Sequence, residues 1–98
     1  MKIVADIDVP FLSGVFEPYG SVIYRKGLEI SREDVIDADA LIVRTRTRCD
    51  RKLLGGSKVR CVASATIGFD HIDTEYVEKQ GIIQTMIISH QKEYLLFK

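Results

Sequence analysis

The sequence predicts an α/β protein with a doubly wound parallel sheet, and three observations support this. Short runs rich in Val and Ile recur along the chain, they show little polar alternation, and the intervals between them are long enough for helical crossovers. Ninety-eight residues have room for one hydrophobic core. Strands that alternate with helices over the whole length favour right-handed crossovers, while the order of the strands is left open.

Five segments are predicted to be strands because each is apolar, rich in β-branched residues and too short for a helix. They are residues 2–5, 21–24, 40–43, 60–63 and 81–88. The first interval between strands predicts a helix that starts at Pro10 and is ended by Pro18 and Gly20. One face of this helix would pack on the sheet through Phe11, Leu12, Val15 and Phe16.

Capping residues predict a helix in each of the other three intervals. Ser31 precedes acidic residues and predicts a short helix that ends near residue 38. Asp50 predicts one or two turns that stop at Gly55 and its neighbour. Asp73 opens the best-specified helix, which Gly81 ends.

Composition and charge exclude several classes of function. Fourteen Lys and Arg balance fourteen Asp and Glu, which removes the bulk attraction that non-specific nucleic-acid and anionic-membrane binders use. The sequence has no stretch of eighteen apolar residues, the length needed to span a bilayer, and its start shows no secretory signal. Cys49 and Cys61 form no paired motif, so we expect a protein of the reducing cytoplasm.

A run of arginines and threonines follows the third predicted strand. Ligands of open parallel sheets bind beyond the carboxyl ends of the strands. The run Arg44-Thr45-Arg46-Thr47-Arg48 places guanidinium groups and hydroxyls there, which suit a small anion with a phosphate or carboxylate. Arginines that merely face solvent at a strand end would explain the pattern equally well.

A turn of small residues follows the fourth predicted strand. In residues 64–71, backbone N–H groups and the Thr66 hydroxyl could approach a ligand, and the turn could face the same site as the arginines. A tight loop that hydrogen-bonds only to itself explains these residues as well, and chemistry alone slightly favours it. His71 beside Asp70 is interpreted as structural, because no nucleophile or second histidine nearby completes a catalytic or metal site.

Two other site patterns are set aside. Asp6 and Asp8 look like the acidic pair of a response-regulator receiver, but Arg44 and Thr45 stand where a receiver needs an aspartate. The seven glycines form neither Gly-x-Gly-x-x-Gly nor a phosphate-binding loop. We therefore expect no metal and no nucleotide cofactor to be held by these residues.

Three blocks of sequence carry a resemblance to a known family. They are residues 1–10 with Met-Lys-Ile, Asp and Pro, residues 38–45 with Ala-Asp-Ala-Leu before Val-Arg-Thr, and Ala-Thr-Ile-Gly-Phe-Asp-His-Ile-Asp at 65–73. Over about residues 1–83 the chain resembles the opening of D-2-hydroxyacid dehydrogenases, in particular those that oxidise 4-phosphoerythronate in pyridoxal phosphate biosynthesis. The resemblance implies an incomplete flavodoxin-like substrate-binding domain at 1–83 and a divergent tail at 84–98.

The resemblance also implies roles for residues and partners. Thr45 and Thr66 would contact the substrate, a small phosphorylated hydroxy acid, and a charge argument adds Arg44 and Arg46 as partners of its phosphate or carboxylate. The family uses NAD, held by a separate Rossmann domain, and forms a homodimer. Its general-acid histidine, with a glutamate and an arginine, lies far downstream of the matched blocks, so no catalytic residue is expected here.

The expected function is therefore the substrate-binding portion of an NAD-dependent oxidoreductase that is inactive by itself, because hydride donor, acceptor and base must be brought together. Two alternatives stay open. The chain could be a stand-alone flavodoxin-like module that binds an anion or a partner, or a gene remnant without function. The sequence does not decide whether the homodimer survives.

Overall fold

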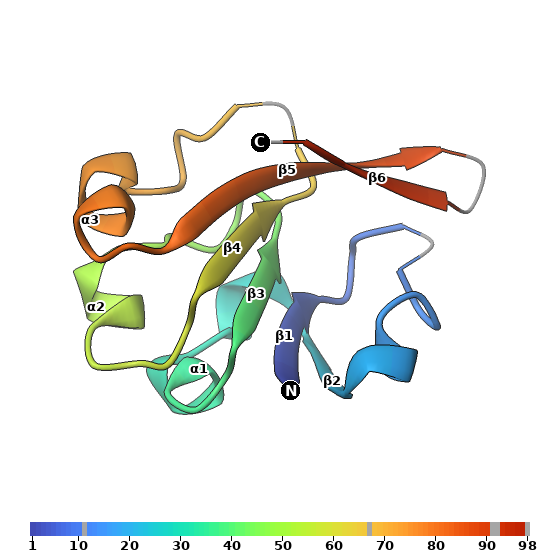
Figure 1. Ribbon diagram of the computed structural model, residues 1–98, viewed down its shortest axis with the longest axis horizontal. Coiled ribbons are helices and arrows are strands. Elements are labelled where there is room, and N and C mark those ends of the chain that lie inside the picture. Colours follow the sequence, from blue (N-terminus) through green and yellow to red (C-terminus); the bar gives the residue numbers. More distant parts are fainter. Residues whose placement is uncertain (11, 67, 91–92, 98) are drawn as a thin grey trace.

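A mixed β-sheet forms the centre of the molecule (Figure 1). The computed structural model describes residues 1–10, 12–66, 68–90 and 93–97, and for residues 88–90 and 93–97 it describes the backbone alone. In these ranges the strands lie in the order β2-β1-β3-β4-β5-β6. Their bounds are β1 (Lys2–Asp6), β2 (Ser21–Arg25), β3 (Ala40–Val43), β4 (Cys61–Ser64), β5 (Ile83–His90) and β6 (Glu93–Phe97).

The first five strands run parallel, which confirms the predicted fold class. Ile3 of β1 lies opposite Val22 of β2 on one side and Ala40 of β3 on the other. With β1 between β2 and β3, the chain winds first toward one edge of the sheet and then toward the other, as in flavodoxin-like folds. The carboxyl ends of these strands therefore meet at one edge of the sheet, here called the carboxyl edge.

The first four predicted strands agree with the observed ones to within one residue at each end, and β5 begins two residues later than predicted. β6 is a correction to the purely parallel sheet that we expected. It pairs antiparallel with β5, with Ile88 opposite Leu95. The segment 93–97 is too short for a stable helix, but as a strand it satisfies the free backbone edge of β5.

The three predicted helix caps are confirmed. The helices are α1 (Arg32–Val35), α2 (Arg51–Leu54) and α3 (Thr74–Lys79). Ser31 opens α1 in a capping box. Asp50 accepts the N–H of Leu53 at 3.2 Å, and Asp73 accepts the N–H of Tyr76 at 3.0 Å. Each carboxylate thus satisfies a backbone donor that the first turn of a helix leaves free.

The helix predicted after Pro10 is wrong. Among the described residues of that interval the chain forms turns and a single 3-10 turn, η1 (Glu17–Tyr19). Gly14 adopts a φ of +88°, in the left-handed region, and donates its N–H to the Glu17 carboxylate at 2.9 Å instead of to a helical carbonyl. A helix cannot run through this position. Phe11, one residue of the expected apolar face, lies outside the described residues.

Apolar side chains cover both faces of the sheet, as a doubly wound fold requires. On one face the helices α1 to α3 pack on Val4, Leu41 and Val62. On the other face the segment between β1 and β2 covers Ile3 and Ala5. That segment contributes the buried Leu12 and the partly buried Val15 and Phe16, so the predicted apolar face packs on the sheet without being helical. In the described ranges no helix has the length and apolarity to cross a membrane.

Candidate functional site

A polar pocket of about 420 Å³ opens at the carboxyl edge, where β1 and β3 end side by side. It is lined by Asp6, Asp8, Arg44, Thr45 and Arg46. Three of the residues that the sequence proposes for substrate binding thus line one cavity, together with the two aspartates that it sets aside. The cavity lies where open parallel sheets bind their ligands.

Arg44 ties the two walls of this pocket together. Its Nη1 donates a hydrogen bond of 2.8 Å to the backbone carbonyl of Asp8. The bond uses one of the five N–H donors of a guanidinium and holds the group over the end of β1. The side chains of Thr45 and Arg46 beside it are exposed. Donors for an anion are therefore presented on one wall, from a single short segment.

Asp6 is a buried acid in the lining of the same pocket. It is 2% exposed, and its Oδ1 accepts the N–H of Asp8 at 2.9 Å. Gly27, in the 3-10 turn η2 (Gly27–Glu29), lies so close that an added Cβ would come within 2.7 Å of Asp6 Oδ2. Two aspartates face two arginines here, so the formal charge of the lining residues is zero. Binding of an anion must then come from directed hydrogen bonds more than from net charge.

Thr47 is the member of the Arg-Thr run that serves the fold. Its buried Oγ1 donates to the carbonyl of Gly27 at 2.9 Å and so fixes the run against η2. Arg48 donates from Nη1 to the carbonyl of Asp70 at 2.9 Å. Residues 44–46 of the run therefore line the polar pocket, Thr47 is buried in the protein, and Arg48 is exposed.

A second depression, of about 440 Å³, continues from Arg46 between η2 and α2. Its charged lining comprises Arg32, Arg46, Arg48, Lys52 and Asp50. Four cations against one carboxylate make this the more basic of the two hollows that Arg46 lines. The Arg46 side chain thus lies between the polar pocket and a positive groove.

Thr66 lies in the turn after β4, next to the end of β3. Val43 and Ser64 are opposite each other in the parallel register, and Ala65 donates its N–H to the Val43 carbonyl at 2.8 Å. Thr45 and Thr66 each follow this pair by two residues, so they leave neighbouring strands at the same edge. Thr66 is half-buried and is not among the residues that line the polar pocket. Ile67, beside it, lies outside the described residues.

His71 has a buried partner that the sequence did not reveal. Its Nε2 lies 3.1 Å from Oγ of Ser64, and Ser64 Oγ lies 3.0 Å from Oγ1 of Thr66. Burial lowers the pKa of His71, the charge of Asp70 opposes this, and Arg48 adds to the lowering. A serine at the end of a buried strand, seven residues before a histidine, was the only signal in the sequence.

The two cysteines are poor nucleophiles. Burial, with the charge of Asp50, raises the pKa of the Cys49 thiol to about 12, and burial also raises the pKa of Cys61. A thiol reacts as its thiolate, so neither is activated near neutral pH. Among the described residues, no group of three or more His, Cys, Asp or Glu side chains is arranged to hold a metal ion.

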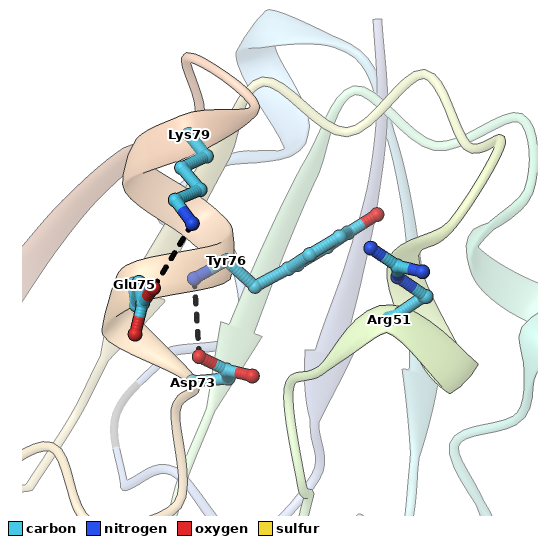
Figure 2. A pocket seen from close by; sticks show the side chains of 5 residues that line it. All are labelled: Arg51, Asp73, Glu75, Tyr76 and Lys79. Carbon is cyan, nitrogen blue, oxygen red and sulfur yellow. Dashed lines mark hydrogen bonds and ion pairs between the residues drawn. The ribbon is translucent and has the colours of Figure 1, made fainter.

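A further pocket, of about 340 Å³, lies between α2 and α3 (Figure 2). Figure 2 shows the Arg51 guanidinium beside the Tyr76 ring, at 5.6 Å from its centroid. Asp73 caps α3, and Glu75 and Lys79 form an ion pair at 3.0 Å. Each of these charged groups contacts another charge, a backbone N–H or the Tyr76 ring, so we interpret the pocket as the packed junction of two helices.

Comparisons with known proteins complete this description. The family model of the D-isomer specific 2-hydroxyacid dehydrogenase catalytic domain matches residues 3–93. Erythronate-4-phosphate dehydrogenase from Bacteroides fragilis (strain YCH46) is 54% identical over 86 residues, which cover 87% of this chain and 25% of the relative. The enzyme of the same name from Saccharophagus degradans is 48% identical over 82 residues, 84% of this chain and 22% of the relative. The chain thus spans about a quarter of the length of these relatives.

Solved structures share the fold. D-lactate dehydrogenase from Aquifex aeolicus, complexed with NAD and lactic acid, superposes with a TM-score of 0.73 at 24% identity over 89% of this chain and 28% of that one. NAD⁺-bound 3-phosphoglycerate dehydrogenase from Entamoeba histolytica gives a TM-score of 0.68 at 30% identity over 90% of this chain and 32% of that one. The resemblance seen in the sequence is therefore confirmed: the chain belongs to the D-isomer specific 2-hydroxyacid dehydrogenases and matches their catalytic domain over residues 3–93.

Proposed function

We propose that this chain forms the substrate-binding surface of a cytoplasmic NAD-dependent dehydrogenase that oxidises the C2 hydroxyl of 4-phosphoerythronate to a ketone, a step of pyridoxal phosphate biosynthesis. The observation that carries the proposal is the pocket in which Arg44, Thr45 and Arg46 meet at the carboxyl edge. The identity of 54% to an erythronate-4-phosphate dehydrogenase supports the choice of substrate.

The pocket offers the donors that such a substrate needs. A phosphate and a carboxylate both accept the paired N–H groups of a guanidinium, and Arg44 and Arg46 supply two such groups. Thr45 adds a hydroxyl between them in sequence, and Thr66 leaves the neighbouring strand at the same edge. The aspartates Asp6 and Asp8 offset the positive charge, so we expect a dissociation constant on the order of 1 mM for this chain by itself.

The residues present here do not fit the dinucleotide. A dinucleotide cradle needs a glycine-rich turn whose free N–H groups face a pyrophosphate. After β1 the chain reads Ile7-Asp8-Val9-Pro10, without glycine, and the N–H groups of Asp8 and Val9 are donated to the side chain and carbonyl of Asp6. Two carboxylates would also repel a pyrophosphate at this point. We therefore assign the chain the holding of the hydroxy acid and derive no step through NAD.

In this account the chain contributes binding and orientation. The guanidinium groups bind the phosphate and the carboxylate of the substrate, and hydrogen bonds from the threonine hydroxyls determine which of its oxygens lie beside them. Positioning of this kind accounts for a large share of enzymatic rate only when the reacting partner and an acid–base group are held beside it. We expect no turnover from these 98 residues alone.

The proposal is tested by thermal unfolding of the chain with and without 4-phosphoerythronate. A ligand at ten times its dissociation constant stabilises the folded state by about 1.4 kcal/mol, which raises the Tm of so small a domain by roughly 5–10 °C. Thr45→Ala and Arg46→Ala should reduce this rise. Arg60→Ala is the matched control, because Arg60 is exposed and precedes β4 at the opposite edge of the sheet.

Three outcomes are distinguished. A saturable rise that Thr45→Ala and Arg46→Ala weaken supports the proposal. An equal rise with sulfate at the same concentration would favour the alternative of a general anion-binding module. No rise in a chain that unfolds cooperatively would contradict the proposed substrate site.

A further inference from the structure

Ser64 is the centre of a short hydrogen-bonded chain that leads from the buried His71 to the half-buried Thr66. Its Oγ lies 3.1 Å from His71 Nε2 and 3.0 Å from Thr66 Oγ1, with the Thr66 carbonyl at 3.5 Å. Ser64 is 0% exposed and His71 is 8% exposed. Buried polar groups persist when they are hydrogen-bonded, so these three residues form one coupled unit. Its outer end, Thr66, is the residue proposed to meet the substrate.

One hydrogen atom on Ser64 makes this chain directional. A serine hydroxyl donates once and accepts twice. When His71 Nε2 carries no hydrogen, it accepts from Ser64, and Ser64 then accepts from the Thr66 hydroxyl. In that state the Thr66 hydrogen points inward, and only lone pairs of Oγ1 face outward. An anion at Thr66 would meet an acceptor.

The direction reverses when His71 Nε2 carries a hydrogen. It then donates to Ser64 Oγ, and Ser64 donates its hydrogen onward to Thr66, whose Oγ1 at 3.0 Å is a nearer acceptor than its carbonyl oxygen at 3.5 Å. The Thr66 hydrogen is released from the chain and can be donated to an external oxygen. An anion at Thr66 would now meet a donor.

We propose that Ser64 and His71 are positioning residues that set the direction of the Thr66 hydroxyl, so that an N–H at His71 Nε2 turns Thr66 into a donor toward a bound anion. The inference rests on the proposed function in one respect, namely that Thr66 faces the substrate. Beyond the proposed function, it assigns a role to Ser64 and His71, which do not line the pocket, and it makes the affinity for an anion depend on pH.

The surroundings of His71 determine the pH at which its Nε2 gains a hydrogen. The charged groups that act on it are Asp70, adjacent in sequence, and Arg48, whose Nη1 donates to the Asp70 carbonyl. Cys49 donates its backbone N–H to the His71 carbonyl at 2.8 Å, and its thiol does not ionise in the range concerned. We assign the hydrogen of the neutral ring to Nδ1, so that Nε2 gains a hydrogen only on protonation; burial favours the neutral ring, and protonation therefore occurs below the ordinary pKa of about 6.5. Since an anion at Thr66 favours the N–H form, anion binding and protonation assist each other.

The experiment follows anion binding to the chain between pH 7.5 and 5.5 by amide NMR. Sulfate is the probe, because its charge is constant over this range, whereas a phosphate monoester titrates near pH 6. In the wild-type chain we expect affinity to rise roughly fivefold toward pH 5.5, the effect of about one hydrogen bond. Thr66→Val should remove this rise, because it removes the hydroxyl that is turned.

Two variants separate positioning from simple charge. His71→Gln keeps a side chain that can hydrogen-bond to Ser64 but does not titrate, so binding should persist with no pH dependence. Ser64→Ala keeps the titrating histidine but breaks the chain, so the pH dependence should again be lost. If Ser64→Ala retains the full fivefold rise, the imidazolium acts on the anion directly and the proposal is wrong. A flat profile in the wild type would also overturn it.

A ligand-free measurement makes the inference independent of the substrate assignment. The His71 imidazole is titrated by NMR in the wild type and in Ser64→Ala. The protonated ring loses its acceptor in the variant, so its pKa should fall further below the ordinary value. An unchanged pKa would mean that the Ser64 contact does not couple to His71. If Ser64→Ala lowers the pKa of His71 but 4-phosphoerythronate does not bind at any pH, the proposed function is contradicted and this inference is not.

Discussion

Arg44, at the end of β3, donates a hydrogen bond of 2.8 Å to the carbonyl of Asp8, just beyond the end of β1, across 36 positions of sequence. The contact exists because β1 and β3 are neighbours in the sheet. It joins the two walls of the polar pocket, so Arg44 helps to build the pocket in which we propose that it also binds the substrate. Substitutions can separate the two roles.

Arg44→Ala should lower the free energy of unfolding by about 1 kcal/mol, the usual net worth of such a hydrogen bond, and should also weaken sulfate binding. Arg44→Lys keeps the charge but not the fork of N–H groups, so it should retain stability better than anion binding. Urea denaturation and amide NMR measure the two effects. An Arg44→Ala chain that binds sulfate as well as the Arg60→Ala control does would exclude Arg44 from the site.

Gly27→Ala should destabilise the fold by about 1–3 kcal/mol, because the new Cβ would stand 2.7 Å from Asp6 Oδ2 in a buried position. The same overlap displaces Asp6, so anion binding in the pocket should change as well. Gly14→Ala is the comparison: its Cβ meets nothing within 4 Å, although the φ of +88° carries a backbone cost. If both variants bind sulfate equally well, Asp6 does not shape the pocket.

His71 should make stability depend on pH even without ligand. Its folded pKa lies below the unfolded value of about 6.5, so the unfolded chain takes up the proton more readily. The stabilising contribution is complete above pH 6.5 and is lost as the pH falls through the folded pKa. His71→Gln should flatten urea midpoints measured between pH 7.5 and 5.5. A slope equal to that of the wild type would assign the dependence to other groups.

Tyr24 should remain protonated in strongly alkaline solution. Burial, reinforced by a hydrogen bond of 2.8 Å from its hydroxyl to the Glu17 carboxylate, raises its pKa to about 12. Because this exceeds the ordinary value near 10, the contribution to stability is complete below pH 10 and is lost as the pH rises toward 12. Tyrosinate absorbance in the wild type and in Tyr24→Phe identifies its titration. Glu17→Gln should lower the pKa of Tyr24, and an unchanged Tyr24 titration in this variant would contradict its pairing with Glu17.

Local signals in the sequence predicted the elements that depend on neighbouring residues. Runs of Val and Ile marked the first four strands to within one residue, and Asp50 and Asp73 marked two helix starts that their carboxylates indeed cap. The turn around Gly14 was missed, since apolar spacing alone suggests a helix there. β6 was missed because its stability comes from pairing with β5.

The sequence predicts only those parts of the site that directly follow the end of a strand. The run at 44–46 could be chosen because ligands bind beyond carboxyl ends. The approach of Asp6 and Asp8 to these arginines depends on the strand order, which the sequence left open. The hydrogen bond from Ser64 to His71 depends on how the turn after β4 folds back, and no spacing rule specifies that.

Binding of a phosphorylated hydroxy acid at the carboxyl edge can be followed residue by residue by amide NMR titration of the isotope-labelled chain with 4-phosphoerythronate. We expect saturable shifts that concentrate in residues 44–47 and 64–66, while α3 (Thr74–Lys79), on one face of the sheet, stays unchanged. Shifts that concentrate instead around Arg51 and Tyr76, or none at concentrations well above 1 mM, would contradict it.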